Sequence, residues 1–404
     1  MANTAWQVAV VGAGPVGLAL ALQAARLLPH ASITLFDARP AEHGVHSDAR
    51  TLALSLGSVM WLQQLGVWDA AAAEAILQIH VSQMAPTFGP LFGGLGASAE
   101  VRLSAAELGL PQLGAVMPYG ALVAPLLRAW LAAVADEPQR LHSRFGTPVV
   151  ALINRPGVEK ASVEVDAGVV QNFDLAVVAE GGVFADQTHK ALTHDYGQTA
   201  WVGTLTLADA PAGMAFERFT RHGPAALLPL PRGADGAQRA ALVWCVQSND
   251  DPVRELTTAQ RLAVLNTIFP ALAGKLLSLS PLKDFALGLN AERTLVHGRT
   301  VRIGNAAQTL HPVAGQGLNL GLRDAHELVA ALRWAEHIDA ALKRVDWARA
   351  ADRWSLIAST DFLARSFTWA WPGAATARGL GLAALQAAPA LKAWVARRMM
   401  FGSR

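Results

Sequence analysis

Three glycines near the N-terminus offer the clearest chemistry in this chain of 404 residues. They follow a short apolar run, and an acidic residue ends the next strand-like run. Glycines in this order permit a tight turn, a close approach of the backbone to a pyrophosphate, and packing of a helix on a strand. The helix N-terminus then faces the phosphates, and the acid can accept hydrogen bonds from ribose hydroxyls. We therefore predict a dinucleotide site; the alternative is a glycine-rich turn beneath an ordinary helix. The residues assigned to it are Gly12, Ala13, Gly14, Pro15, Val16, Gly17 and Asp37.

A second glycine-rich segment lies far along the chain. A strand-like run ends at Gly304, and a loop that contains Pro312 leads into a helical pattern. The run from Gly315 to Gly317 fails as a second dinucleotide fingerprint, because the third glycine is Gly321 and no acid-terminated strand follows. What remains is a helix N-terminus whose backbone N–H groups suit an anionic or electron-rich edge of a ligand.

The elements that position these residues follow from hydrophobic spacing. Strands over 7–11 and 32–36 enclose the first helix, which is the pattern of a βαβ unit. From 199 to 247, strands alternate with proline and glycine turns, which indicates an antiparallel sheet, and helical pattern dominates from Gly317 onward. The remaining expected elements are helices over 51–65 and 120–135 and strands over 148–153, 162–165 and 173–179.

With these motifs the chain resembles the flavin-dependent aromatic hydroxylases that share the p-hydroxybenzoate hydroxylase fold. That family carries an N-terminal GxGxxG for the ADP part of FAD, a central Asp-Gly motif, and a late Gly-Asp motif before a proline and a glycine-rich helix start. The resemblance covers nearly the whole chain. Three stretches look like the ubiquinone-biosynthesis branch, and residues 304–312 are most similar to its 2-polyprenyl-6-methoxyphenol hydroxylases. The three stretches are 47–55, 216–230 and 304–324.

The resemblance implies an α/β fold with three parts. It predicts a Rossmann-like FAD-binding domain with a parallel sheet, a substrate domain built on an antiparallel sheet, and a C-terminal helical region. The FAD-binding domain would comprise 1–75, 100–182 and 286–340, the substrate domain 76–99 and 183–285, and the helical region 341–404.

Further cofactor contacts are carried over from the family position by position. Arg50 would lie near the FAD pyrophosphate, where its cationic fork suits phosphate oxygens, or it is an exposed arginine at a helix start. Asn319 matches the position that contacts the flavin pyrimidine edge, with a helix cap as the alternative. Glu180 and Asn305 stand where the family has Asp, and both can still form hydrogen bonds. The other implied contacts are Gly181, Gly304, Pro312, Gly315, Gln316, Gly317 and Leu318.

The same resemblance implies the reaction. A transient NAD(P)H reduces FAD, the reduced flavin captures O2 as its 4a-hydroperoxide, and the terminal oxygen attacks an electron-rich phenol in an apolar, water-poor pocket. His311 could relay the phenolic proton, or it is a loop histidine bonded to backbone. Tyr119 and Tyr196, the only tyrosines, are more readily structural. His43 and His46 lack further ligands at matching spacing, so we expect no metal.

Composition bears on where such an enzyme works. Hydrophobic residues make up 52% and charged residues 16%, yet the most apolar stretch, 8–22, contains three glycines and a proline, so no membrane span is expected. One cysteine, Cys245, fits a reducing cytoplasm, and a net charge of +2 predicts no nucleic-acid partner.

The last part of the chain differs in charge from the rest. After Asp361 there is no acidic residue, while six of the 33 basic side chains lie there, which leaves 27 against 31 acidic ones elsewhere. A basic and apolar tail predicts helices on the inner face of the cell membrane, where a polyprenylated phenol could enter, or a helical cap docked on the other domains. Other ubiquinone-biosynthesis proteins are further expected partners. Alternative functions are hydroxylation of another ring position or of a soluble aromatic, or an inert flavoprotein scaffold.

Overall fold

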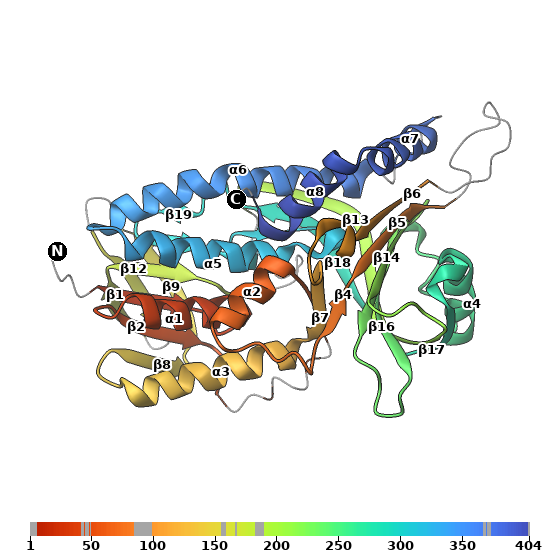
Figure 1. Ribbon diagram of the computed structural model, residues 1–404. Coiled ribbons are helices and arrows are strands. Elements are labelled where there is room, and N and C mark those ends of the chain that lie inside the picture. The colour runs from red at the N-terminus through yellow and green to blue at the C-terminus, as the bar shows by residue number, and fades with distance from the viewer. Residues whose placement is uncertain are drawn as a thin grey trace.

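The structure has two bodies, each built on a large sheet (Figure 1). The central element of the first is a six-stranded sheet. The computed structural model describes residues 6–41, 44, 48, 50–84, 99–154, 159–165, 168–181, 190–366, 369 and 373–402. Neighbouring strands of this sheet run parallel except the terminal pair, β19 with β20. In sheet order the strands are β19 (Val296–His297), β20 (Thr300–Arg302), β12 (Leu175–Val178), β1 (Gln7–Val11), β2 (Ser32–Asp37) and β8 (Leu141–Phe145).

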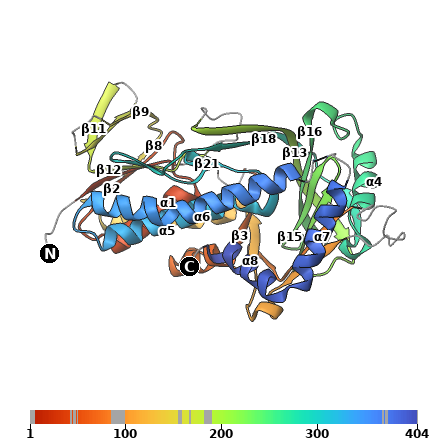
Figure 2. The same ribbon diagram turned by 90° about the horizontal axis from the view of Figure 1, so that it is seen from above.

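Both faces of this sheet are covered, as the apolar strands require. On one face, side chains such as Val8 and Val10 pack in a core with the helices, and α6 packs on α5. On the other face, Ala9 and Phe36 pack against a small antiparallel sheet (Figure 2). The helices are α1 (Pro15–Leu27), α2 (Leu56–Gln64), α3 (Tyr119–Asp136), α5 (Gly317–Arg333) and α6 (Ile338–Ser366); the small sheet is β9 (Val149–Asn154), β10 (Ala161–Val165) and β11 (Val169–Phe173).

The second body is a nine-stranded, mostly antiparallel sheet with α4 (Thr258–Ile268) packed on one face. A three-stranded sheet, β3 (Thr51–Ser55), β7 (Gly114–Pro118) and β4 (Glu74–Ile76), adjoins its other face. The nine strands are β5 (Gln78–Gln83), β6 (Glu100–Ser104), β13 (Leu192–Ala208), β14 (Met214–Thr220), β15 (Gly223–Leu230), β16 (Gln238–Gln247), β17 (Lys275–Leu279), β18 (Lys283–Ala291) and β21 (Gln308–Thr309).

These elements confirm the expected α/β class and the antiparallel sheet, and they correct one helix. The helix predicted from Thr51 begins only at Leu56, because residues 51–55 form β3 and pair antiparallel with β7. The partner strand lies about sixty residues away, so the local pattern cannot reveal it. The domain limits stay a prediction; β6 and β18 extend the nine-stranded sheet beyond the limits proposed for the substrate domain.

The C-terminal helices α7 (Ala374–Ala387) and α8 (Pro389–Phe401) dock on both bodies. The Lys392 ammonium forms an ion pair with Glu107 at 3.0 Å, and the Arg102 backbone N–H donates to the Gln386 side chain at 2.9 Å. Met400 lies in an apolar cluster with residues of the three-stranded and the nine-stranded sheet. These contacts support the docked cap that the sequence left as one alternative.

One described helix, α3, has the length and composition that could cross a membrane. It differs from the stretch 8–22, which the sequence marked as most apolar. In the structure, α3 packs its Leu122, Leu126 and Trp130 side chains in the core of the first body. A helix at the core of a folded domain meets the same criterion.

Candidate functional site

The first glycine loop is shaped by crowding of the backbone. Gly12 has a φ of 104°, and a Cβ there would lie 2.8 Å from the Glu180 nitrogen. A Cβ on Gly17 would lie 1.9 Å from the Gly12 carbonyl oxygen, whereas one on Gly14 would meet nothing within 4 Å. The turn therefore needs glycine at two positions and leaves open space at the third, next to the N-terminus of α1. It also brings the central motif, Glu180 with Gly181, against this loop.

Asp37 orders the same loop from the end of β2. Its buried carboxylate accepts the Ala13 backbone N–H at 2.7 Å and a backbone N–H plus two side-chain N–H groups of Arg39 at 2.8 to 3.0 Å. Burial alone would raise the Asp37 pKa, but these hydrogen bonds outweigh it and lower the pKa. All four acceptor positions are filled, so the predicted ribose contact requires Arg39 to yield one of them.

Arg39 was missed by the motif, although it lies two residues after Asp37 and so on the same side of an extended chain. It connects the loop to a second cation. Tyr119, buried at the start of α3, lies near Arg39, and the Arg50 guanidinium lies 4.4 Å from the centre of its ring. Arg50 also pairs with Asp48 at 2.6 Å. Two arginines beside a helix N-terminus suit a pyrophosphate.

Glu180 adjoins the first glycine loop through its backbone at Gly12. Partial burial, and then the Asp37 carboxylate, raise the pKa of Glu180. Glu180 and Gly181 are themselves exposed at the end of β12, beside the loop. The first group of predicted cofactor residues is thus assembled from three separate stretches of chain.

The second glycine segment crosses the first at Val16. Gly304 has a φ of 59°, and a Cβ there would contact the Val16 side chain at 3.5 Å. A Cβ on Gly321 would lie 2.7 Å from the Gly304 Cα. The Asn305 carbonyl accepts from the Lys190 ammonium at 2.7 Å, and burial lowers the pKa of Lys190 to about 8. This crossing brings α1, α5 and the late motif to one place.

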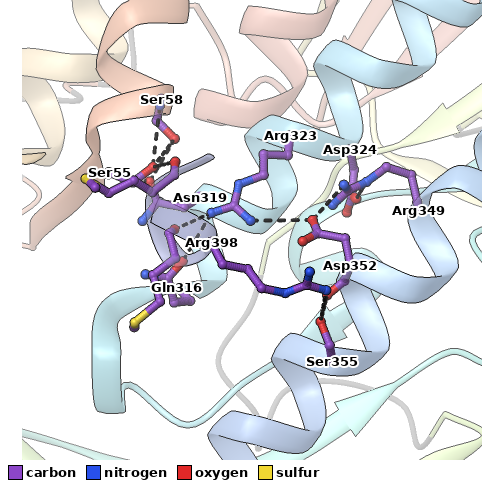
Figure 3. A network of polar contacts seen from close by, with 12 residues as sticks. Ser55, Ser58, Gln316, Asn319, Arg323, Asp324, Arg349, Asp352, Ser355 and Arg398 are labelled. Carbon is purple, nitrogen blue, oxygen red and sulfur yellow. Dashed lines mark hydrogen bonds and ion pairs between the residues drawn. The ribbon is translucent and has the colours of Figure 1, made fainter. Parts of the chain in front are cut away.

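Asn319 holds the start of α5 against β3 (Figure 3). Its Oδ1 accepts from the Ser55 backbone N–H and the Ser58 hydroxyl, both at 2.8 Å. Its Nδ2 donates to the carbonyls of Ala53 and Gly315 at 3.1 and 2.9 Å. The amide is filled by these contacts and holds the start of α5 in position. Its contact with the flavin stays a prediction.

His311, in the loop before α5, is also held by hydrogen bonds at both ring nitrogens. Its Nδ1 accepts the Val313 backbone N–H at 3.1 Å, so Nε2 carries the proton and donates to the Gln198 side chain at 2.8 Å. Burial lowers the His311 pKa to about 4, and the ring packs edge-to-face on Tyr196. Both nitrogens are occupied, which favours the bonded loop histidine over the proton relay.

A buried ionic network extends from this helix start to the C-terminal helices (Figure 3). Arg349 pairs with Asp324 at 2.9 Å and with Asp352 at 2.7 Å. Arg323 lies between Asp352, at 3.4 Å, and the Met399 carbonyl, to which it donates at 2.5 Å. The end of α8 is therefore tied to the same helix that presents the second glycine loop.

An apolar cleft of about 650 Å3, its open mouth included, lies beside that loop. Pro312, Val313 and Gly315 form one wall, and the face of the nine-stranded sheet opposite α4 forms another. Among the lining side chains of the described residues, only Glu217 and Cys245 are polar. Sequence reasoning missed Glu217; its signal is a single acid within an apolar run of strands. The remaining lining residues are Ala53, Ile76, Ile79, Ala215, Phe216, Pro224, Ala226, Leu228 and Val243.

The predicted cofactor residues thus form two groups that meet at Val16. The first group offers open space at Gly14, a helix N-terminus and two arginines; the second presents Gly317, where a Cβ would also meet nothing within 4 Å. The residues present fit FAD, with its ADP part on the first group and its ring system toward the cleft. His43 and His46 lie outside the described residues.

Comparison with known proteins agrees with this geometry. A family model described as an FAD binding domain matches residues 5–348. The 3-demethoxyubiquinol 3-hydroxylase of Escherichia coli is 30% identical over 97% of this chain and 97% of its own. The ubiquinone hydroxylase UbiL of Rhodospirillum rubrum is also 30% identical, over 97% of this chain and 89% of its own.

Solved structures share the fold at lower identity. The p-nitrophenol 4-monooxygenase PnpA of Pseudomonas putida superposes with a TM-score of 0.71 at 16% identity, over 99% of both chains. Klebsiella pneumoniae HpxO, solved with FAD and uric acid, has a TM-score of 0.70 at 16% identity, over 98% of this chain and 97% of its own. The chain therefore belongs to the FAD-binding family of flavin-dependent aromatic hydroxylases, in which FAD is the cofactor and the enzymes are monooxygenases.

Proposed function

We propose that this enzyme hydroxylates the ring of a polyprenylated phenol in ubiquinone biosynthesis, with NAD(P)H and O2 as co-substrates. The observation that carries the proposal is the cleft beside Pro312 and Gly315, which is apolar on nearly all sides and adjoins the second glycine loop. A phenol ring with a hydrocarbon tail matches such a lining. Two relatives that match nearly the whole chain are named as hydroxylases of this pathway.

In this proposal, the protein positions FAD and the phenol ring and excludes water from the reacting atoms. FAD, once bound and reduced by NAD(P)H, supplies an activated oxygen atom derived from O2. The backbone at Gly14 and the arginines Arg39 and Arg50 hold the pyrophosphate, and residues 312–318 face the ring system. The apolar walls of the cleft keep water from the reacting atoms and hold the phenol ring next to them.

The direct test is oxygen transfer. Purified enzyme loaded with FAD is given NAD(P)H, 18O2 and a short-chain polyprenyl methoxyphenol, and the product is analysed by mass spectrometry. One 18O atom in a new ring hydroxyl is the expected result. A yellow, reducible protein that converts no prenylated phenol but hydroxylates a soluble aromatic would overturn the substrate, and a protein that cannot be loaded with FAD would support the scaffold alternative.

The ring position is tested separately. The sequence favours 2-polyprenyl-6-methoxyphenol, whereas the relative from E. coli is named for the 3-position of demethoxyubiquinol. We expect the gene to restore ubiquinone in a strain blocked at hydroxylation of the methoxyphenol. Restoration only in a strain blocked at a different ring position would overturn the specific substrate and leave the chemistry intact.

We also propose that the C-terminal helices contact the inner face of the membrane, from which a polyprenylated substrate enters. Several of their basic side chains bind within the protein: Arg378 donates to the Ser366 carbonyl and Arg397 to that of Leu108. The support for membrane contact therefore comes chiefly from exposed apolar side chains. Leu380, Leu391 and Trp394 are each more than half exposed.

Substitutions are better than truncation for testing this contact, because the end of α8 is bonded to Arg323 and Ser55. Leu391→Ser with Trp394→Ser should at least halve flotation with anionic vesicles while FAD absorbance is retained. Trp347→Ser on α6, where the indole is 84% exposed, is the matched control and should float as the wild type does. Equal flotation of all three proteins would contradict the contact.

A further inference from the structure

Glu217 lies on β14, and strand alternation points it at the cleft. Its neighbours at alternate positions, Ala215 and Phe219, face the same way: Phe219 packs with Val313 of the second loop. Arg218 points to the opposite face, where it donates to the Ile268 carbonyl at the end of α4. The Glu217 carboxyl therefore projects between the nine-stranded sheet and the loop that faces the flavin ring system.

Within the part of the chain that the structure describes, no charged group balances this carboxyl. Among the described residues, no hydrogen bond or ion pair to Glu217 occurs, and the titratable side chain nearest to it in the cleft is the Cys245 thiol, whose pKa is raised by burial and then by Glu217. His80, on the neighbouring strand β5, points to the other face, where it contacts Phe216 and bonds Glu100. On the loop side, both ring nitrogens of His311 are occupied.

An acid without a partner is expensive to keep in an apolar cleft, and packing alone gives no reason for it. The cleft also offers a phenol few other proton acceptors, since the rest of its described lining is apolar apart from a thiol. We infer that Glu217 is the catalytic residue that takes the phenolic proton of the substrate. This inference rests on the proposed function, because it requires a phenol in the cleft.

The step is a proton transfer without a change of oxidation state. The O–H bond of the phenol breaks, its proton forms a bond to a carboxylate oxygen of Glu217, and the electron pair stays on the ring oxygen. The resulting phenolate is richer in electrons at the ring carbons that receive oxygen. When the hydroxylated ring regains its aromatic form, the C–H bond of the carbon that received oxygen breaks, and its hydrogen leaves as a proton that ends in water with the second oxygen atom of O2. The proton held by Glu217 then returns to the ring oxygen, and the carboxylate is restored.

The acidity of the group suits this role. Burial raises the pKa of Glu217 to about 8. An ordinary phenol has a pKa of about 10. The equilibrium for proton transfer from the phenol to Glu217 is therefore much less unfavourable than for transfer to an ordinary carboxylate, whose pKa is about 4.3. A positioned base near the operating pH contributes roughly 10²- to 10⁴-fold to a rate.

The test compares Glu217→Gln with the wild type. The variant should bind FAD and be reduced by NAD(P)H as the wild type is, while hydroxylation falls roughly 10²- to 10⁴-fold and H2O2 replaces the product. Wild-type kcat/KM should rise with pH toward a plateau above pH 8, and the variant should lose this limb. A substrate with a more acidic phenol, such as a fluorinated ring, should recover part of the loss. Glu255→Gln, an exposed acid elsewhere on the chain, should change none of these.

Two results would overturn the inference and leave the proposed function standing. One is Glu217→Gln with wild-type hydroxylation; the other is a wild-type pH profile without a limb near pH 8. If Glu217→Gln does not fold, Glu217→Asp takes its place. Wild-type hydroxylation by Glu217→Asp, or a wild-type pH profile without a limb near pH 8, would then overturn the inference. Failure of the wild type to hydroxylate any prenylated phenol would instead overturn the proposed function.

Discussion

The two glycine-rich loops that cross at Val16 are held by different forces. The first is shaped mainly by steric crowding, since a Cβ on Gly17 would lie 1.9 Å from the Gly12 oxygen, and a single hydrogen bond from Ala13 to Asp37 adds to it. The second is held by side-chain hydrogen bonds from Asn319 and His311. Crowding does not depend on pH, whereas hydrogen bonds depend on protonation and on each partner. A single substitution at a crowded glycine of the first loop should therefore cause a large loss of stability. Substitutions in the second loop should cause smaller losses that depend on how many hydrogen bonds each one removes.

The strongest test of this contrast is Gly17→Ala. The added methyl has no room, so we expect a loss of about 3 kcal/mol or more in the free energy of unfolding, even without FAD. Thermal unfolding of the apoprotein measures it.

Gly14→Ala is the matched control, because a Cβ there meets nothing within 4 Å. The apoprotein should unfold at the wild-type temperature, while the approach of the pyrophosphate is obstructed and FAD binds at least about tenfold more weakly, or 1.4 kcal/mol. Equal stability of the two apo variants would contradict steric control of the first loop.

Asn319→Ala should weaken the second loop less completely. It leaves buried partners on β3 and α2 unpaired, so we expect a loss of about 2 to 4 kcal/mol in stability together with weaker FAD binding. Asn319→Asp keeps the acceptor and loses the donors, so it should fall between alanine and the wild type. Asn266→Ala on α4, which also breaks hydrogen bonds but far from the loops, should lower stability without changing FAD affinity.

Acid should affect the second loop before the first, because the lowered pKa of Asp37 keeps the carboxylate that orders the first loop ionised to a lower pH. The folded-state pKa of His311, about 4, lies below the unfolded value of 6.5, so the unfolded chain takes up the proton first. The contribution of neutral His311 to the free energy of unfolding is fully present above about pH 6.5. It is lost as pH falls toward 4, and the total loss is on the order of 3 kcal/mol.

Urea midpoints between pH 7 and 4 measure this effect. His311→Asn should be less stable at pH 7 but lose less on acidification than the wild type. His337→Asn, which changes an exposed histidine, should follow the wild-type curve. Parallel curves for His311→Asn and the wild type would remove protonation of His311 as the cause.

The contrast also explains what could be predicted. Glycine spacing reflects steric requirements directly, so the turn over Gly12 to Gly17 and its strand and helix can be predicted from the sequence. The strands from 199 to 247 can also be predicted, from their alternation with proline and glycine turns. Side-chain networks cannot, because their partners are distant in the sequence. Nothing near Asn319 in the sequence indicates that Ser55 and Ser58 will occupy its amide, and nothing near Thr51 indicates its pairing with Pro118.

The groups beside the glycines were missed for related reasons. Arg39 has a weak signal in its spacing from Asp37, whereas Tyr119 has none, because its contact with Arg50 joins two distant segments. Glu217 could have been noticed as an isolated acid in an apolar strand. Only the sheet topology shows that this strand faces the second loop.

The order of strands in the central sheet governs how the chain can fold. Val8 of β1 pairs with Leu175 of β12, and Ala176 pairs in turn with Thr300 of β20. Contacts between such distant segments form slowly, because long loops must close before they are stabilised. By contrast, β13 to β16 are mostly joined by short turns and can pair early. We therefore expect the cofactor site to form late in folding, so retention of flavin by a variant would report that these distant segments have come together.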